Sequence, residues 1–237
     1  MSSTQDNNKQ TPGRIREFWD RIVSGEGSTV VSESGRAEGA LIREGTLVRL
    51  REHTSANRED FQRWYSDPEI ARLLRHDLKP LPPLQSGIYF DSVILPGSHR
   101  RQMFAIHDVA TDSLIGTTGI TDLDYGVRGG CYFRIVIGEP QFWGHGFGTE
   151  ATRLVLQEAF EYHQRRLVQL EVFSYNERAF RAYERVGFRK TGEHIEWPGP
   201  GLGELRVFEM RIERDWFDPE VRDQTAKPDA PRPADPT

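Results

Sequence analysis

Residues 141–160, QFWGHGFGTEATRLVLQEAF, place a glycine-rich stretch directly before a long apolar helix pattern. Gly144, Gly146 and Gly148 alternate with larger residues, so the backbone can turn sharply and approach a ligand closely. The first turn of the following helix has unpaired N–H groups and lies at the positive end of the helix dipole. Together these features favour a cradle for an anion such as a phosphate or pyrophosphate.

Two other glycine-rich motifs do not fit this spacing. A P-loop has Lys followed by Ser or Thr after its last glycine, and neither pair follows here. A Rossmann fingerprint reads G-x-G-x-x-G, whereas this stretch reads G-x-G-x-G. A plain turn is the alternative if the glycines are taken alone.

The order of patterns along the chain predicts a mixed fold. A compact domain is expected over residues 40–217. Alternating or apolar runs predict strands at 46–52, 101–109, 113–124, 129–140, 166–174, 188–197 and 203–213. Helical patterns are expected at 57–74, from Gly148 to about His163, and at 176–187. The resulting order predicts an α+β (mixed α/β) fold, in which helices flank a mixed sheet.

Both ends of the chain are expected to lie outside this domain. Residues 1–39 read as an extension with a linker and one apolar helical stripe, formed by Ile15, Phe18, Trp19, Ile22 and Val23. The stripe is expected to dock on its own domain or on a second subunit, with a membrane-surface anchor as the alternative. Residues 218–237 are Pro-rich and are expected to be disordered.

Composition limits the class of protein. Of the 237 residues, 31 are basic and 36 acidic, giving a formal charge of −5. This balance disfavours sequence-independent nucleic-acid binding and suits a cationic substrate. The single cysteine, Cys131, excludes a disulfide within the chain, and no run approaches the roughly 18 apolar residues of a membrane span. We therefore expect a cytoplasmic protein with no nucleic-acid or membrane partner.

Two runs in the correct order, IVIGEPQFWGHGFGTEA at 135–151 and LEVFSYNERAFRAYERVGF at 170–188, closely resemble the GNAT superfamily of N-acetyltransferases. The branch that they resemble most includes ribosomal-protein N-terminal acetyltransferases and spermidine acetyltransferases. The resemblance covers about residues 47–217. It implies a GNAT-like fold, with a mostly antiparallel sheet of about six to seven strands and a splayed strand pair that opens a CoA cleft.

The resemblance also implies an activity. Acetyl-CoA would be the co-substrate, and the acetyl group would pass directly to a primary amine, either a protein or peptide N-terminus, a polyamine or another small amine. A homodimer is also implied. The alternative is a non-catalytic acyl-CoA-binding sensor or interaction module on the same fold.

The cofactor contacts that the resemblance implies begin at the strand tip. A backbone N–H near Ile137 would face the acetyl carbonyl, with an ordinary paired strand as the alternative. The CoA pyrophosphate would lie on a loop made of Trp143, Gly144, His145, Gly146, Phe147, Gly148 and Thr149. Trp143 stands where the signature often has Gln or Arg, so its side chain is not expected to contact phosphate. His145 would be a phosphate neighbour or a bystander.

Amine acetylation needs a base, because an alkylamine with a pKa of about 10.4 is protonated at neutral pH. Glu171 is the candidate base, through water, and Glu139 the reserve; a solvent-facing strand glutamate is the alternative. Asn176 suits a helix N-cap, and the resemblance adds a contact to pantetheine. Tyr183 would protonate the leaving thiolate, or serve only as a core aromatic.

Three further expectations concern other side chains. The remaining histidines show no metal-ligand spacing, so no metal is expected. Cys131 is expected to be a buried core thiol, not an acetyl carrier. The acceptor pocket is expected to be built from the helix pattern at 60–74 and the loop before residue 203. Four side chains in the helix pattern suit a cation or an ordinary surface: Trp64, Tyr65, Asp67 and Glu69.

Overall fold

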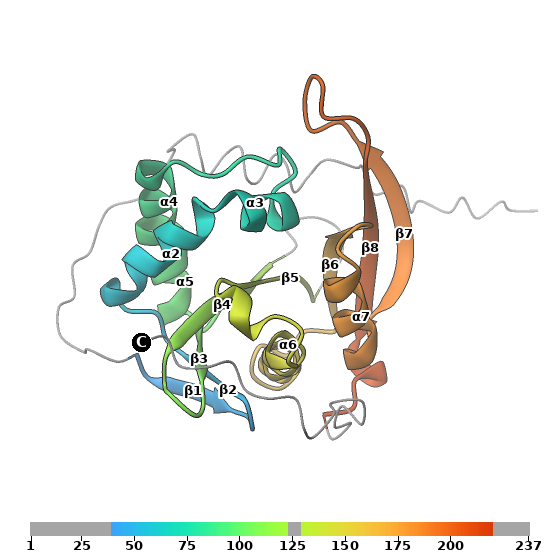
Figure 1. Cartoon of the computed structure of the whole chain (residues 1–237). Coiled ribbons are helices and arrows are strands. Elements are labelled where there is room, and N and C mark those ends of the chain that lie inside the picture. The colour runs from blue at the N-terminus through green and yellow to red at the C-terminus, as the bar shows by residue number, and fades with distance from the viewer. Residues whose placement is uncertain (1–38, 123–128, 220–237) are drawn as a thin grey trace, which may run out of the picture.

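The computed structural model describes residues 39–122 and 129–219 (Figure 1). The expected N-terminal stripe at Ile15–Val23 and the Pro-rich tail from residue 220 lie outside these residues. None of the helices within the described ranges has the length and apolar character needed to cross a lipid bilayer.

One eight-stranded sheet forms the centre of the molecule, in the order β1-β2-β3-β4-β5-β6-β8-β7. All neighbouring pairs are antiparallel except β5 and β6, which run parallel. The strands are β1 (Leu41–Glu44), β2 (Val48–Arg51), β3 (Met103–Asp108), β4 (Leu114–Asp122), β5 (Gly130–Ile137), β6 (Leu167–Phe173), β7 (Arg189–Glu196) and β8 (Leu205–Glu213).

The parallel pair β5 and β6 separates soon after it begins. Its ladder has three pairs and ends where Tyr132 lies opposite Gln169, although β5 continues to Ile137 in register with β4. The Tyr132 hydroxyl occupies the fork, where it accepts a hydrogen bond from the backbone N–H of Glu171 at 2.9 Å. The expected splayed pair is therefore confirmed, and Figure 1 shows the gap between the two ribbons.

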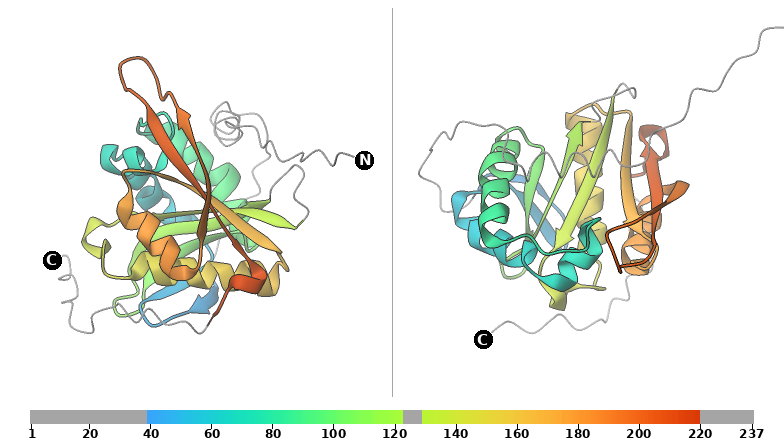
Figure 2. Two further views of the ribbon diagram at one scale, coloured as in Figure 1. Left: turned by 90° about the vertical axis from the view of Figure 1, so that its right-hand side faces the viewer. Right: turned by 90° about the horizontal axis from the view of Figure 1, so that it is seen from above.

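Two helices cover one face of the sheet. Helix α6 (Phe147–Gln157) continues into a π-helical turn (Glu158–Tyr162), and α7 (Glu177–Val186) follows β6. Their apolar faces join the larger core cluster, which contains Phe133 of β5 and Leu170 of β6. Figure 2 shows α6 and α7 side by side on this face. Helix α7 ends at Gly187, whose φ of 105° is left-handed and suits glycine.

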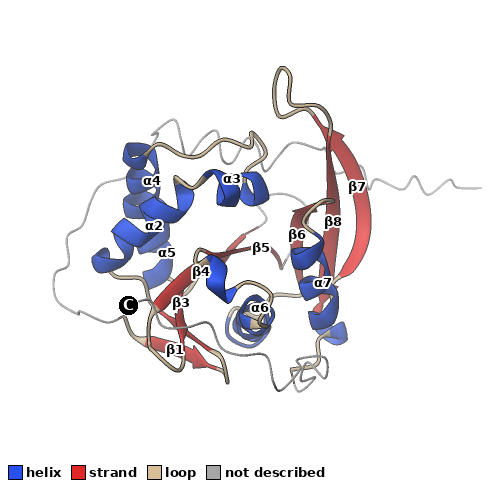
Figure 3. Ribbon diagram, in the orientation of Figure 1, coloured by secondary structure: helices blue, strands red, loops and turns tan. Residues whose placement is uncertain are grey.

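The other face carries the helices that lie between β2 and β3. These are a 3₁₀ turn (Ser55–Asn57), α2 (Arg58–Tyr65), α3 (Pro68–Leu74), α4 (Pro83–Tyr89), a π turn (Phe90–Ile94) and α5 (Leu95–His99). They enclose a second cluster around Phe61, Trp64 and Tyr65. Figure 3 shows these helices on the far side of the sheet from α6 and α7.

The sequence predicted most elements but missed some. The fold class and the β3–β4 turn at Thr111–Asp112 are confirmed, and Asp112 has a φ of 57°. The sheet has eight strands instead of six to seven, because the short β1 pairs with β2 through a bulged register that leaves no clear alternation. No helix was expected at 83–99. Pro83 begins α4, where proline is tolerated, whereas Pro96 lies just after the π turn, inside one continuous helical run from α4 to α5.

Candidate active site

The glycine stretch forms a tight turn between β5 and α6. Gly144 and Gly146 have φ values of 82° and 90°, a conformation that strains other residues. A Cβ added at Gly144 would meet nothing within 4 Å, so the loop faces open space there. Gly146 is the N-cap of α6, and glycine has no side chain with which to cap the first-turn N–H groups. In contrast, Asp67 caps α3 and Asn176 caps α7.

The start of α6 is held in place by a carboxylate. Glu150 accepts hydrogen bonds from the backbone N–H groups of Thr46, Leu47 and Val48 at 2.9, 2.6 and 2.8 Å. These contacts tie the first turns of α6 to the β1–β2 turn. The helix N-terminus is thus rigidly placed, as a preorganised set of N–H donors requires.

Trp143 closes the loop back onto β5. Its indole N–H donates to the carbonyl of Ile137 at 2.7 Å. The guanidinium of Arg178, on α7, lies over the indole ring at 4.0 Å from its centre. The Trp143 side chain is therefore used in packing, and a cation stands beside Gly144. His145 is half-buried within the loop.

The backbone N–H of Ile137 points toward the gap between β5 and β6. The backbone N–H of Gly138 donates to the carbonyl of Ile115 at 2.9 Å, so Gly138 and Ile115 of β4 form a hydrogen-bonded pair of the antiparallel ladder. Because the pattern alternates along an antiparallel ladder, Ile137 directs its N–H and C=O to the opposite side, past the end of the β5–β6 ladder. Gly138 is needed for packing, since a Cβ there would lie 2.2 Å from the Trp64 ring.

Glu171 lies on β6 with its side chain on the face away from α7. Its neighbours Leu170 and Val172 belong to the core cluster, as the predicted alternation requires. Burial raises the pKa of Glu171 to about 7, an effect that nearby Glu196 and Glu209 reinforce and His76 and His194 oppose. Glu209 of β8 lies directly opposite Glu171 in the ladder.

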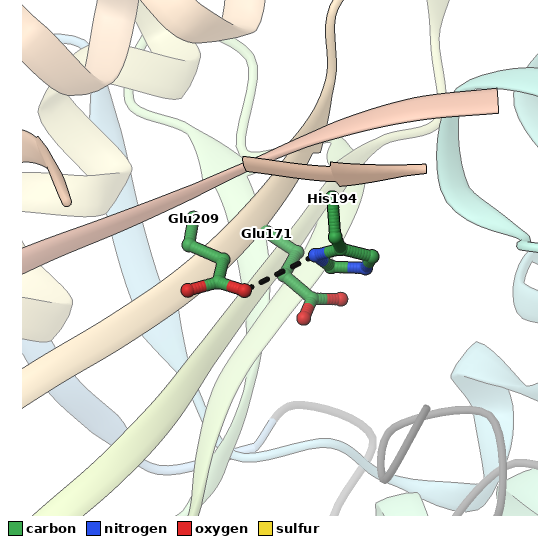
Figure 4. Close-up of side chains that lie close together, drawn as sticks. All are labelled: Glu171, His194 and Glu209. Atoms are coloured by element: carbon green, nitrogen blue, oxygen red, sulfur yellow. Dashed lines mark hydrogen bonds and ion pairs between the residues drawn. The ribbon is translucent and has the colours of Figure 1, made fainter. Parts of the chain in front are cut away.

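Four further ionisable side chains surround Glu171, and sequence reasoning did not identify them. His76 Nε2 lies 3.5 Å from Glu171 Oε2, and His76 Nδ1 lies 2.6 Å from Glu196. His194 contacts Glu196 at 3.0 Å and Glu209 at 3.1 Å. Figure 4 shows Glu171, His194 and Glu209 grouped on neighbouring strands. The spacing of two between His194 and Glu196 places both side chains on one face of a strand, so this pair could have been found from the sequence. No local pattern places His76 beside them.

Part of this group has the geometry of a metal site. One ligand atom each from Glu171, His194 and Glu209 lies within 4.8 Å of the others. The sequence spacing did not suggest such a set, since its members come from three strands. However, both ring nitrogens of His194 already lie within hydrogen-bond distance of carboxylates. The negative charges of the carboxylates are therefore compensated by ion pairs within the group.

Glu139, the reserve base, is engaged elsewhere. Its carboxylate accepts hydrogen bonds from Arg63 at 2.6 Å and from the indole of Trp64 at 2.9 Å. Its carboxylate is therefore already bound by two side chains of α2. The geometry favours Glu171 over Glu139.

Tyr183 and Asn176 lie at the α7 side of the gap. Tyr183 packs edge-on against Phe133 and Phe188, and burial raises the pKa of its hydroxyl. Asn176 uses its side-chain oxygen to accept from Ala179 N–H at 3.3 Å. A pantetheine contact would have to come from its amide nitrogen.

The residues expected to line an acceptor pocket have mainly structural roles. Trp64 and Tyr65 are buried in the second core cluster. Asp67 accepts from the N–H groups of Glu69 and Ile70 as the α3 cap. Of the four, Glu69 alone is exposed. The expectation that aromatic and acidic residues here face a substrate is therefore wrong for Trp64 and Tyr65, because α2 turns them into the core.

Cys131 lies inside the sheet. It is fully buried, and burial raises the pKa of its thiol to about 12. The group thus remains a neutral thiol near neutral pH, where a thiolate would be needed for an acetyl carrier. This agrees with the expectation of a core thiol.

Comparisons with known proteins agree with this geometry. A family model described as an acetyltransferase (GNAT) domain matches residues 48–189. A GNAT-family acetyltransferase from Bacillus anthracis has a TM-score of 0.61 at 14% identity, covering 73% of this chain and 98% of that one. Spermidine N-acetyltransferase from Vibrio cholerae, solved with CoA and spermine, has a TM-score of 0.61 at 20% identity, covering 72% and 97%. No curated protein matches the sequence.

Proposed function

Because the chain belongs to the GNAT acetyltransferase family, whose members use acetyl-CoA, we propose that it transfers the acetyl group directly to a primary amine. The acceptor would be a polyamine, another small amine, or a protein N-terminus. The solved relative from Vibrio cholerae acts on spermidine and supports, without fixing, the branch that we infer. A homodimer remains a prediction.

One observation carries the proposal, namely the gap between β5 and β6. Glu171 and Tyr183 lie on opposite faces of the sheet, so a continuous sheet would keep them apart. The β5–β6 ladder ends after three pairs, and through this opening both groups would reach one reacting centre. The N–H of Ile137 points into the same gap, where it would stabilise an oxyanion.

The residues of the loop fit the co-substrate. The first-turn N–H groups of Phe147, Gly148 and Thr149 would bind the pyrophosphate, which Gly144 and Gly146 allow to approach. His145 and Arg178 would be its cationic neighbours, and Asn176 would contact the pantetheine. When bound, acetyl-CoA supplies the activated thioester.

The two catalytic candidates would then move protons. Glu171 would accept a proton from the amine, directly or through water, and a pKa of about 7 suits a base at neutral pH. Tyr183 would donate to the departing sulfur. Its raised pKa keeps the hydroxyl protonated across the working range.

The test measures thiol release from acetyl-CoA with a panel of polyamines, amino acids, aminoglycosides and peptides. We expect turnover with at least one cationic amine, and a loss of about 100-fold or more for Glu171→Gln. Glu139→Gln is the matched control and should retain far more activity. Binding of CoA without turnover of any amine would instead indicate a non-catalytic acyl-CoA-binding module.

A further inference from the structure

Five ionisable side chains form a closed group beside the gap. Glu171 of β6, Glu209 of β8, and His194 and Glu196 of β7 share one face of the sheet, and His76 enters from the loop after α3. Directly opposed glutamates such as Glu171 and Glu209 repel each other. The two histidines supply the compensating positive charge, but they do so in different ways.

His194 is held on both sides. Nε2 lies 3.0 Å from Glu196 Oε1, and Nδ1 lies 3.1 Å from Glu209 Oε1. Burial alone would lower the pKa of His194, but hydrogen bonds to Glu196 and Glu209 and the charge of Glu171 raise it overall. Both ring nitrogens of His194 are therefore engaged by carboxylates, which favours its protonated form.

His76 is held on one side only. Nδ1 lies 2.6 Å from Glu196 Oε2, while Nε2 faces Glu171 Oε2 at 3.5 Å, beyond a normal hydrogen bond. When the Nδ1 proton is donated to Glu196, Nε2 carries a lone pair directed at Glu171. A histidine oriented by a carboxylate, with its second nitrogen open, is the arrangement of a proton acceptor.

The loop that carries His76 is built to hold it there. Arg75 binds both oxygens of Asp77, at 2.9 and 2.6 Å, and the next residue, Leu78, has a φ of 58°. A left-handed leucine is strained, and such strain persists where the surroundings enforce it. Leu78 packs on a small apolar cluster that includes Phe173, and the His76 ring meets Phe173 edge-on at 5.2 Å.

We propose that His76 receives the proton that Glu171 takes from the acceptor amine, which makes His76 a positioning residue acting through the catalytic carboxylate. This rests on the proposed function. An amine N–H bond breaks as an O–H forms on Glu171. That O–H breaks as an N–H forms at His76 Nε2, which restores the carboxylate. Glu196 stabilises the imidazolium, and the proton leaves to water before the next turnover.

The acceptor role of His76 gives a readout beyond simple loss of structure. Its ring faces Glu171 of β6 and Glu196 of β7, with His194 and Glu209 behind them and Asp77 in its own loop. His76 touches neither the glycine loop nor the helix α6 N-terminus in the proposed arrangement. Removing it should therefore lower kcat and leave the KM for acetyl-CoA unchanged.

The experiment compares His76→Gln, His76→Ala and the wild-type chain by thiol release across pH, with His99→Gln on exposed α5 as the matched control. We expect kcat of both His76 variants to fall about tenfold, less than for a direct base. The KM for acetyl-CoA should stay unchanged, imidazole should restore His76→Ala, and His99→Gln should match wild type. Glu196→Gln keeps a hydrogen-bond acceptor for His76 Nδ1 but loses the charge that stabilises the imidazolium, so it should also lower kcat.

Three outcomes would overturn the inference. The first is a wild-type protein that is active together with a His76→Gln variant whose kcat is unchanged. The second is activity lost in EDTA and restored by Zn²⁺, because a metal would then occupy Glu171, His194 and Glu209. The third is a wild-type protein inactive with every amine, which would overturn the proposed function as well.

Discussion

The two sides of the β5–β6 gap present different kinds of chemical group. On the α6 side, the candidate site consists of backbone N–H groups, fixed by left-handed glycines and by the Glu150 contacts to the β1–β2 turn. On the other side, around Glu171, it consists of titratable side chains brought together from β6, β7, β8 and the α3–α4 loop. Backbone donors do not titrate near neutral pH, whereas the charges of the second group depend on pH and on one another. Substitutions on the two sides should therefore fail differently, in affinity on the first and in turnover and pH dependence on the second.

The largest expected effect concerns Tyr183, which stands between the two sides. Tyr183→Phe removes the hydroxyl and leaves the ring contacts with Phe133 and Phe188. We expect kcat to fall about 100-fold, the lower end of general acid catalysis, with little change in CoA affinity. Steady-state thiol release and calorimetric titration with CoA would measure the two effects. Tyr162→Phe, at an exposed tyrosine, is the control. Equal turnover of Tyr183→Phe and wild type would show that Tyr183 is a core aromatic.

A smaller effect is expected at the glycine loop. In Gly146→Val, a β-branched side chain must adopt a φ near 90°, and its Cβ would lie 3.3 Å from Leu47. The loop should shift away from its donor geometry, weakening CoA binding about tenfold, equivalent to about 1.4 kcal/mol. Gly201→Val imposes similar backbone strain in the β7–β8 loop, at a φ of 78°, and should leave affinity unchanged. Calorimetry that found both variants binding like wild type would contradict the backbone cradle.

The same contrast explains what the sequence could predict. The loop, α6 and the cap at Asn176 depend on neighbouring residues, so local patterns gave their positions. Glu171 was predicted from its place in a strand followed by a helix start. His76 was not, because it lies in a short loop between α3 and α4 and meets Glu196 only through the folded chain, 120 positions away.

The glycine loop was predicted and the helical run over 83–99 was missed, each for a physical reason. Gly144 and Gly146 were correctly placed because each adopts a left-handed conformation that few other residues tolerate. The helical run over 83–99 carries Pro96 in its interior and contains a π turn at Phe90–Ile94, so its sequence lacks a regular helical pattern. The inward-facing side chains of α2 were missed for another reason. Trp64 and Tyr65 are adjacent and both fully buried, so no single helical stripe marks them as core.

The last expected effect concerns stability instead of activity, and tests whether ionisation of Glu171 destabilises the folded protein. The pKa of Glu171 rises from 4.5 to about 7, so the folded state binds the proton more tightly than the unfolded chain. The free energy of unfolding should therefore fall as the pH rises through this interval. Glu171→Gln removes the ionisation and should match wild type near pH 4, but exceed it near pH 8 by up to about 3 kcal/mol, which corresponds to the full pKa shift. Urea unfolding at both pH values would measure the difference, and Glu204→Gln, at an exposed loop position, should differ from wild type by less than about 0.5 kcal/mol at either pH. If Glu171→Gln were instead less stable near pH 8, the ionised carboxylate would stabilise the folded state. The charged side of the gap would then have all its charges compensated, as the backbone side has its hydrogen bonds.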